Sequence, residues 1–183
     1  FKNENVGFFY RDNVWAMVMN EKERMNDNDK KIFGEIEPKL LEMGIKKNLN
    51  FGDEDNYYGF GWSHNLGKAG IWSEGPMSTL LFKIDKIQKD FKLEIFCLPY
   101  ITKKNNTSEF DIYVNNTFNK NVKLKNNNQE EKIEIIVKKE FLTGDEIKID
   151  FNFKNPISPY EVLESPDSRK LGILIKGIKI DSI

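Results

Sequence analysis

The sequence predicts a mainly β protein, an antiparallel jelly-roll β-sandwich preceded by a helical N-terminal segment. Two runs, 131–138 and 146–153, alternate apolar and polar residues, which is typical of strands with one buried and one solvated face. From residue 57 on, short apolar runs recur at regular spacing and are separated by turns rich in Asn and Gly. Between residues 20 and 43, apolar residues instead recur at intervals of three and four, as on one face of a helix.

The change of period divides the chain near residue 50. We expect residues 1–50 to be a helical extension or a linker from an upstream domain, and residues 51–183 to form the jelly-roll sandwich. Pro38 is expected in the first turn of a second short helix, where its missing N–H costs nothing, and Gly44 is expected to end that helix.

The β part contains nine candidate strands, and turn residues separate several of them. The expected strands are 57–62, 70–74, 78–84, 91–98, 109–115, 120–124, 131–138, 146–153 and 171–182. The pair Asn115 and Asn116 predicts a turn, because Asn tolerates the left-handed conformation. Ser158 followed by Pro159 indicates a capped helical turn before the last strand, and the glycine in the middle of that strand suggests a bulge.

The composition excludes several function classes. The 28 basic and 29 acidic residues are interspersed, so nucleic acid is not an expected partner. The single Cys97 cannot form an intramolecular disulfide and is expected to be buried in a strand. No run approaches the roughly 18 apolar residues of a membrane span, and no signal peptide opens the chain. We expect a piece of a larger bacterial protein that is cytoplasmic or peripheral to the membrane.

Three sequence motifs resemble those of a known module. They are Gly61-Trp62-Ser63 with Gly70-Ile71-Trp72-Ser73-Glu74-Gly75, the segment 156–163, and Pro166-Asp167-Ser168-Arg169-Lys170-Leu171-Gly172-Ile173. Together they resemble the C-terminal β-sandwich accessory module of bacterial surface-polysaccharide glycosyltransferases and phosphoglycerol-transferase-like proteins. The resemblance covers residues 57–183 and implies a galactose-binding-like jelly roll with an accessory role in glycan assembly. The chain departs from the motif at residues 64–66, where His64-Asn65-Leu66 replaces the Pro-Glu pair of the module.

The aromatic residues near the first motif have two interpretations. Trp62 and Trp72 lie on strands one loop apart, so they could form a stacking platform for a sugar ring, extended by Tyr57 or its neighbour Tyr58. The alternative is core packing, since tryptophans on strands are highly buried on average.

The polar candidates are His64, Glu74 and Arg169. His64 is the single histidine; it fits the rim of a binding site better than catalysis, because no nucleophile elbow accompanies it. Glu74 and Arg169 could reach a polar ligand, or Arg169 could form a structural clasp with Asp167 or Glu74.

Metal binding has one candidate site in the sequence. Asp53 and Asp55 supply oxygen ligands for a structural calcium ion, although the loop lacks the spacing of an EF-hand, and a solvated acidic turn is the alternative. No other cofactor is expected.

These observations favour a non-catalytic accessory module of a polysaccharide transferase that recognises a glycan or glycan precursor. Its ligand-binding residues would be Tyr57, Trp62, His64, Trp72, Glu74 and Arg169, and its other partner the upstream catalytic domain. The alternative is a structural docking or self-association domain without a ligand. One His, one Cys and no phosphate-binding loop give little support to catalysis within the chain itself.

Overall fold

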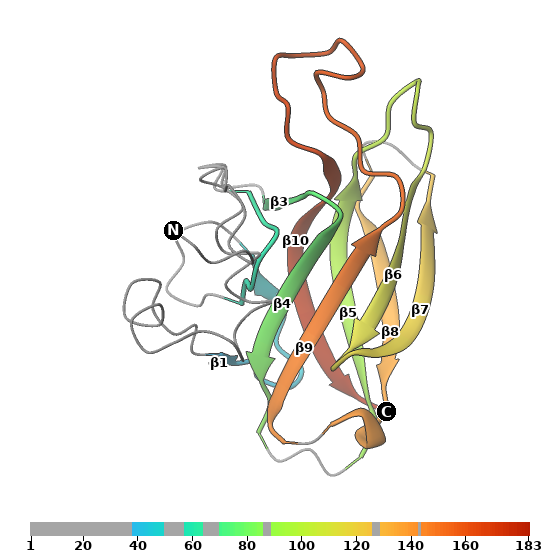
Figure 1. Cartoon of the computed structure of the whole chain (residues 1–183). Helices are drawn as coiled ribbons and strands as arrows, with labels where there is room; N and C mark the ends of the chain where they lie inside the picture. The colour runs from blue at the N-terminus through green and yellow to red at the C-terminus, as the bar shows by residue number, and fades with distance from the viewer. Residues whose placement is uncertain (1–37, 50–56, 64–69, 86–88, 126–128, 143) are drawn as a thin grey trace, which may run out of the picture.

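A computed structural model describes residues 38–49, 57–63, 70–85, 89–125, 129–142 and 144–183. These residues form two packed sheets, which lie face to face in Figure 1. Within them, no helix combines the length and apolar character needed to cross a membrane. The mainly β sandwich predicted from the sequence is therefore confirmed, while His64, Asp53, Asp55 and most of the predicted helical segment lie outside the described residues.

The first sheet, which we call sheet A, has the order β1-β4-β9-β6-β7. Its strands pair antiparallel except for the short β1, which runs parallel to β4. The strands are β1 (Lys39–Leu40), β4 (Met77–Lys83), β9 (Glu146–Phe153), β6 (Ser108–Val114) and β7 (Thr117–Leu124).

The second sheet, sheet B, has the order β2-β10-β5-β8, and β3 also pairs with β10. All of its pairings are antiparallel. The strands are β2 (Lys47–Asn48), β10 (Leu171–Ser182), β5 (Phe91–Pro99), β8 (Glu131–Val137) and β3 (Ile71–Glu74). A short 3-10 helix, η1 (Lys139–Phe141), follows β8.

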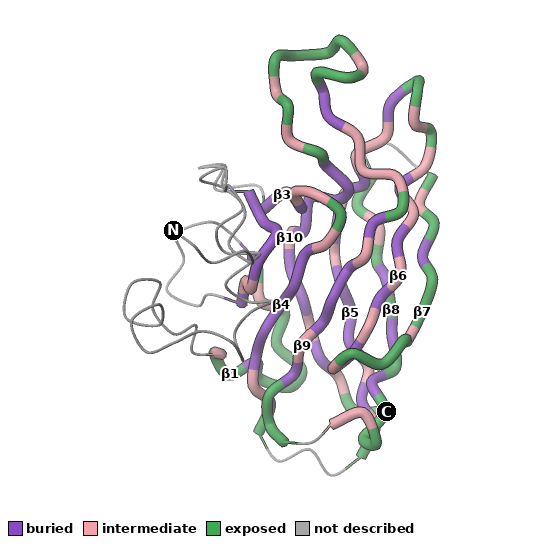
Figure 2. The backbone as a smooth tube through the Cα atoms, in the orientation of Figure 1, coloured by how far each residue is buried: buried purple, intermediate pink, exposed green. Residues whose placement is uncertain are grey.

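The core lies between the two sheets, where every second residue of each long strand points inward. In β9 the buried series is Ile147, Ile149, Phe151 and Phe153, and in β8 the odd positions are more buried than the even ones. Figure 2 shows this as alternation of colour along β6, whereas β4 is buried over most of its length. Cys97 is fully buried, as predicted, and burial raises its thiol pKa to about 12.

Two local predictions are confirmed. Asn115 and Asn116 both have positive φ angles (46° and 69°) and join β6 to β7 in a tight hairpin. The register between β10 and β5 shifts between Ile175 and Gly177, so the last strand does carry a bulge at its central glycine.

The second short helix predicted from Pro38 to Gly44 is wrong. Lys39 and Leu40 form β1, and the Leu41 N–H donates to the Lys83 carbonyl oxygen at 2.8 Å. Leu41 is buried while Leu40 is half exposed, which is the alternation of an extended chain. The edge of β4 presents backbone N–H and C=O groups, and this segment pairs with them as a strand. This pairing outweighs the weak helical preference indicated by the spacing of its few apolar residues. Gly44 does adopt the predicted positive φ, but in a turn before β2.

The predicted strand 57–62 is not continuous. Only isolated bridges link Tyr58 to Leu80 and Trp62 to Ser73. Gly61 has a φ of +76°, which interrupts the extended backbone, and a Cβ atom there would collide with the Met77 carbonyl. The predicted helix before β10 is likewise reduced to a hydrogen-bonded turn, which ends at Leu163 with a φ of +63°.

Candidate functional site

The first and third motifs singled out in the sequence meet at β3, and the segment 156–163 joins them through backbone hydrogen bonds between Ile157 and Leu171. The Glu74 N–H donates to the Gly61 carbonyl at 2.7 Å, and the Gly75 N–H donates to the Lys170 carbonyl at 2.8 Å. The buried Ser73 hydroxyl accepts from the backbone N–H groups of Gly172 and Ile173, at 3.1 and 2.9 Å. Segments far apart in the sequence therefore build one local structure.

Alternation along β3 decides which side chains reach the surface there. Ile71 and Ser73 are buried, whereas Trp72 and Glu74 are partly exposed and point away from the core. Trp72 lies opposite Leu174 of β10, and Glu74 lies opposite Leu171. Trp72 is thus a tryptophan on the outer face of sheet B.

Tyr100, just beyond the end of β5, backs the Trp72 ring. The two ring centroids are 5.8 Å apart and the planes meet at 85°, an edge-to-face contact. The Tyr100 hydroxyl donates to Glu164 Oε2 at 2.9 Å. Burial, followed by that hydrogen bond and by the negative charges of Glu164 and Asp167, raises the pKa of Tyr100 to about 12. The phenol therefore stays a neutral donor at physiological pH.

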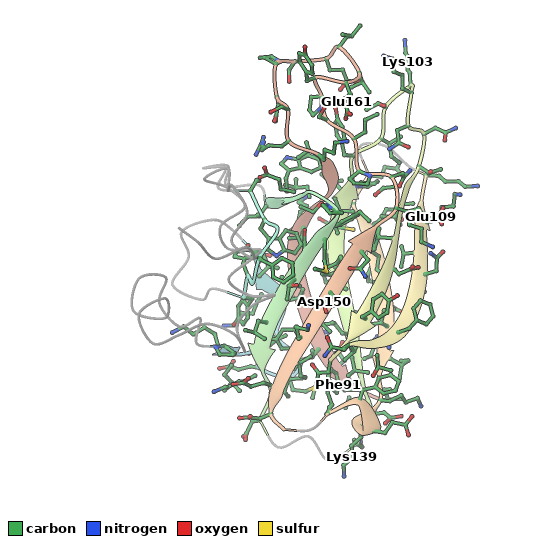
Figure 3. The ribbon with its side chains drawn as sticks, in the orientation of Figure 1. Phe91, Lys103, Glu109, Lys139, Asp150 and Glu161 are labelled. Carbon is green, nitrogen blue, oxygen red and sulfur yellow. The ribbon has the colours of Figure 1, made fainter. Side chains whose placement is uncertain are left out.

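Glu164 belongs to the loop between β9 and β10, which projects beyond the sheets at the top of Figure 1 and carries the labelled Glu161 in Figure 3. Its turn is a capping box. The Glu161 N–H donates to the Ser158 hydroxyl at 3.1 Å, and the Ser158 N–H donates to Glu161 Oε2 at 2.9 Å. The Lys104 ammonium donates to the Glu161 carbonyl at 3.1 Å, which ties this loop to its neighbour.

Arg169 and Asp167 form a two-pronged ion pair, and the Asp167 carboxylate is close enough to Tyr100 for its charge to act on the phenol. Arg169 Nε lies 2.9 Å from Asp167 Oδ1, the Nη2 group donates to Oδ2, and the Arg169 N–H donates to Oδ1 at 3.0 Å. The guanidinium lowers the pKa of the Asp167 carboxyl, so the pair stays charged. The predicted clasp to Asp167 is confirmed. Both side chains remain about a quarter exposed.

Tyr57 and Trp62 belong to the core instead. Tyr57 is 1% exposed and donates to the Leu40 carbonyl at 3.1 Å. Trp62 is 6% exposed, its Nε1 donates to the Thr79 carbonyl at 2.7 Å, and its ring meets Phe151 edge to face. The core-packing alternative describes these two residues, and their burial contradicts a platform shared by Trp62 and Trp72.

The resulting group, which we call the Trp72 cluster, consists of Trp72, Tyr100, Glu164, Asp167 and Arg169. It joins one aromatic face to carboxylate acceptors and a planar cationic donor, which is the chemistry that holds a sugar ring. Sequence reasoning identified Trp72 and Arg169 but missed Tyr100 and Glu164. Tyr100 could have been found, since it continues the outward positions 96 and 98 of the predicted strand 91–98.

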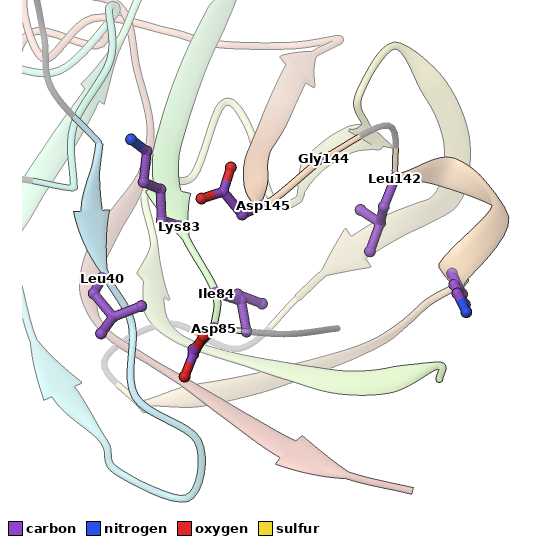
Figure 4. Close-up of a pocket in the computed structure, with 8 residues that line it drawn as sticks. Leu40, Lys83, Ile84, Asp85, Leu142, Gly144 and Asp145 are labelled. Carbon is purple, nitrogen blue, oxygen red and sulfur yellow. The ribbon is translucent and has the colours of Figure 1, made fainter. Parts of the chain in front are cut away.

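No three His, Cys, Asp or Glu side chains among the described residues are grouped to hold a metal ion. A pocket of about 630 Å³ lies away from the Trp72 cluster, beside the ends of β1 and β4 and the start of β9 (Figure 4). Its lining mixes apolar and charged side chains: Leu40, Lys83, Ile84, Asp85, Lys139, Leu142, Gly144 and Asp145. Its described lining residues include none of the predicted site residues.

Comparison with known proteins gives no match to a family model and none to a curated protein. Solved structures with a similar fold include carbohydrate-binding modules. The CBM36-1 domain of a multidomain xylanase, from the hindgut metagenome of Trinervitermes trinervoides, has a TM-score of 0.47 and 10% identity, over 76% of this chain and 98% of that domain. A family 35 carbohydrate-binding module from an environmental isolate has a TM-score of 0.39 and 12% identity, over 73% of this chain and 83% of that module.

An uncharacterized Listeria monocytogenes protein, in complex with glucose, magnesium and calcium, has a TM-score of 0.40 and 15% identity over 74% of this chain. The matched region is only 10% of that protein's length. At these identities the likeness concerns the fold alone.

Proposed function

We propose that this chain is a non-catalytic glycan-recognition domain whose ligand binds against Trp72. The observation that carries the proposal is the Trp72 cluster: a partly exposed indole in edge-to-face contact with Tyr100, whose phenol in turn lies within range of the charge of Asp167, the partner of Arg169. An indole face suits the C–H face of a pyranose, while the carboxylates and the guanidinium suit its hydroxyl groups.

The site is held in place before any ligand arrives. Tyr100 is fixed by Glu164, and Arg169 by Asp167 through both its side chain and its backbone N–H. Such bracing reduces the entropy lost on binding, because the contacting side chains are already in one arrangement. Glu74, on the same outward side of β3 as Trp72, is the additional polar residue we assign to the site. His64 is retained as a rim residue in this proposal.

The parent protein in our proposal is a bacterial surface-polysaccharide transferase, of capsule or lipooligosaccharide, with its catalytic domain upstream. The support is the resemblance of the three motifs, whose segments are joined by hydrogen bonds at β3 and at Leu171. In this view the domain positions a glycan or glycan precursor, in the cytoplasm or at the membrane surface.

Isothermal titration calorimetry against saccharides chosen on a glycan array tests the proposal. Trp72→Ala should weaken binding by about tenfold or more, the equivalent of roughly 1.4 kcal/mol for a lost stacking contact. Tyr160→Ala is the matched control, because Tyr160 is an aromatic residue with 63% exposure outside the cluster. Circular dichroism must show that both variants are folded. Absence of saccharide binding, or an affinity unchanged by Trp72→Ala, would contradict the proposal.

A second candidate function is docking to the parent enzyme or self-association. It is favoured by three exposed apolar side chains near β1 and β2, those of Leu40, Met43 and Ile45, at 50%, 48% and 46% exposure. Leu40→Ser with Ile45→Ser should then lower the sedimentation coefficient of the protein, which Trp72→Ala would leave unchanged.

A further inference from the structure

The outer face of sheet A carries its own ordered set of side chains. In β9, β6 and β7 the residues that alternate with the core positions point away from sheet B. Figure 1 looks onto this face, and Figure 3 labels Asp150 near its middle and Glu109 nearer the projecting loop. The strand registers arrange these side chains in rows that cross the sheet.

The first row is aromatic. Tyr113 lies opposite Asp150 of β9 on one side and opposite Phe118 of β7 on the other. The rings of Tyr113 and Phe118 are 5.7 Å apart and meet at 75°. Phe118 is 53% exposed, so an aromatic ring on a strand, supported by a second ring, is presented to solvent.

The second row is made of amides and a carboxylate. Asp111 lies opposite Asn152 of β9 and opposite Asn121 of β7. Asn121 Nδ2 donates to Asp111 Oδ1 at 2.7 Å, and Lys154 Nζ lies 3.3 Å from the same oxygen. Both contacts use Oδ1, and within the described part of the chain no side-chain hydrogen bond uses Oδ2, which can therefore accept from another group. Asn152 Oδ1 is buried and accepts no hydrogen bond from the described residues.

The charges on this face compensate one another. Lys123 Nζ lies 2.9 Å from Glu109 Oε2, and Lys148 Nζ lies 3.0 Å from Asp150 Oδ2. With Lys154 beside Asp111, each carboxylate of the face has a lysine partner. A local balance of this kind selects neither anions nor cations, so a matching ligand is an uncharged one.

We propose that this face, built around Phe118, Asp111 and Asn121, is a second glycan-binding surface that takes an uncharged β-linked pyranose chain. Rows two residues apart along a strand are separated by roughly 7 Å, about the size of one sugar ring. A ring stacked on Phe118 therefore places its hydroxyl groups near the amide and carboxylate row. Chains with equatorial linkages and hydroxyl groups are extended and present an apolar C–H face, which fits an open sheet better than a closed pocket.

The test uses cellohexaose and xylohexaose, with maltohexaose as the bent α-linked comparison and hexagalacturonate as the charged one. Chemical-shift mapping of ¹⁵N-labelled protein should show changes at 109–113, 117–123 and 150–154 with at least one uncharged β-linked chain. Those changes should persist in Trp72→Ala. Phe118→Ala should weaken this binding by about tenfold or more, and Asp111→Asn by less.

The control is again Tyr160→Ala, and thermal unfolding checks that each variant is folded. Shifts confined to the Trp72 cluster, or no shifts with any of the chains, would overturn the second surface. Loss of binding in Trp72→Ala with retention in Phe118→Ala would do the same while supporting the first site. If Phe118→Ala changes the sedimentation coefficient but not saccharide binding, the face contacts a second copy and the proposal fails.

Discussion

Trp72 and Tyr100 make their edge-to-face contact across β10, although the strands that carry or precede them do not pair with each other. Trp72 lies opposite Leu174 of β10, and Leu174 lies opposite Leu98 of β5, two residues before Tyr100. The contact therefore requires β3 and β5 to flank the same strand on opposite sides. It also connects the sheet to the projecting loop, because Tyr100 holds Glu164.

This connection predicts an alkaline effect on stability. Tyr100 has a folded-state pKa of about 12 against an ordinary value of 10.0, so its stabilising contribution is complete below pH 10 and is lost as the pH rises toward 12.

Glu164→Gln should lower the Tyr100 pKa, because it removes a charged acceptor and a repelling negative charge. Absorbance titration of the phenolate, with Tyr100→Phe to assign the step, measures this. Glu146→Gln, a similar change at the first residue of β9, should leave the step in place. An unmoved step in Glu164→Gln would contradict the assignment.

The contrast between Trp62 and Trp72 separates what the sequence could predict from what it could not. Alternation identified the long strands because their buried and solvated faces differ in every second residue. Residues 57–62 and 70–74 are too short for that test, and the positive φ of Gly61 interrupts the alternation just before Trp62. Only the fold reveals that one indole fills the core while the other reaches the surface.

Acid stability should depend on Glu94, which lies on the outer face of sheet B and is only 7% exposed. Hydrogen bonds from Lys92, then Lys132, lower its pKa from 4.5 to about 2 despite its burial. Its contribution is therefore present above pH 4.5 and is lost as the pH falls toward 2. Urea unfolding of the wild type should show a loss of roughly 1–3 kcal/mol over that range that Glu94→Gln does not show. Glu134→Gln, the more exposed neighbour, serves as the control for charge; an equal pH dependence in the wild type and Glu94→Gln would argue against the assignment.

The edge of sheet B is closed by side chains of the other sheet. β8 is the last strand of its sheet among the described residues, and Asn119 and Lys120 of β7 donate to its carbonyls at Ile136 (2.7 Å) and Glu134 (3.1 Å). The register between β6 and β7 shifts between Ile112 and Tyr113, next to the residues of β7 that contact β8. No residue pattern in 117–124 predicts such contacts, because they depend on how the two sheets pack against each other.

We expect the double variant Asn119→Ala, Lys120→Ala to uncover this edge. The lost hydrogen bonds should lower the free energy of unfolding by about 1–2 kcal/mol, and the exposed strand should promote self-association. Sedimentation velocity at several protein concentrations measures the association. Lys125→Ala, one residue beyond β7, removes a lysine without touching β8 and should remain like the wild type. A variant that is monomeric at every concentration would show that the edge needs no such cover.

The hairpin between β6 and β7 gives a pair of opposite expectations at adjacent asparagines. Both residues have positive φ, so glycine would relieve strain at either. Asn116 makes one exposed contact, to Lys148 Nζ, and Asn116→Gly should raise the free energy of unfolding by about 0.5 kcal/mol. Asn115 Oδ1 accepts from the Lys148 N–H at 2.8 Å and its Nδ2 donates to the Phe141 carbonyl at 3.2 Å, so Asn115→Gly should instead lower it by about 1–2 kcal/mol. Urea unfolding with equal m-values decides the matter: if the two variants change stability in the same direction, the side chain of Asn115 does not hold the hairpin against β9.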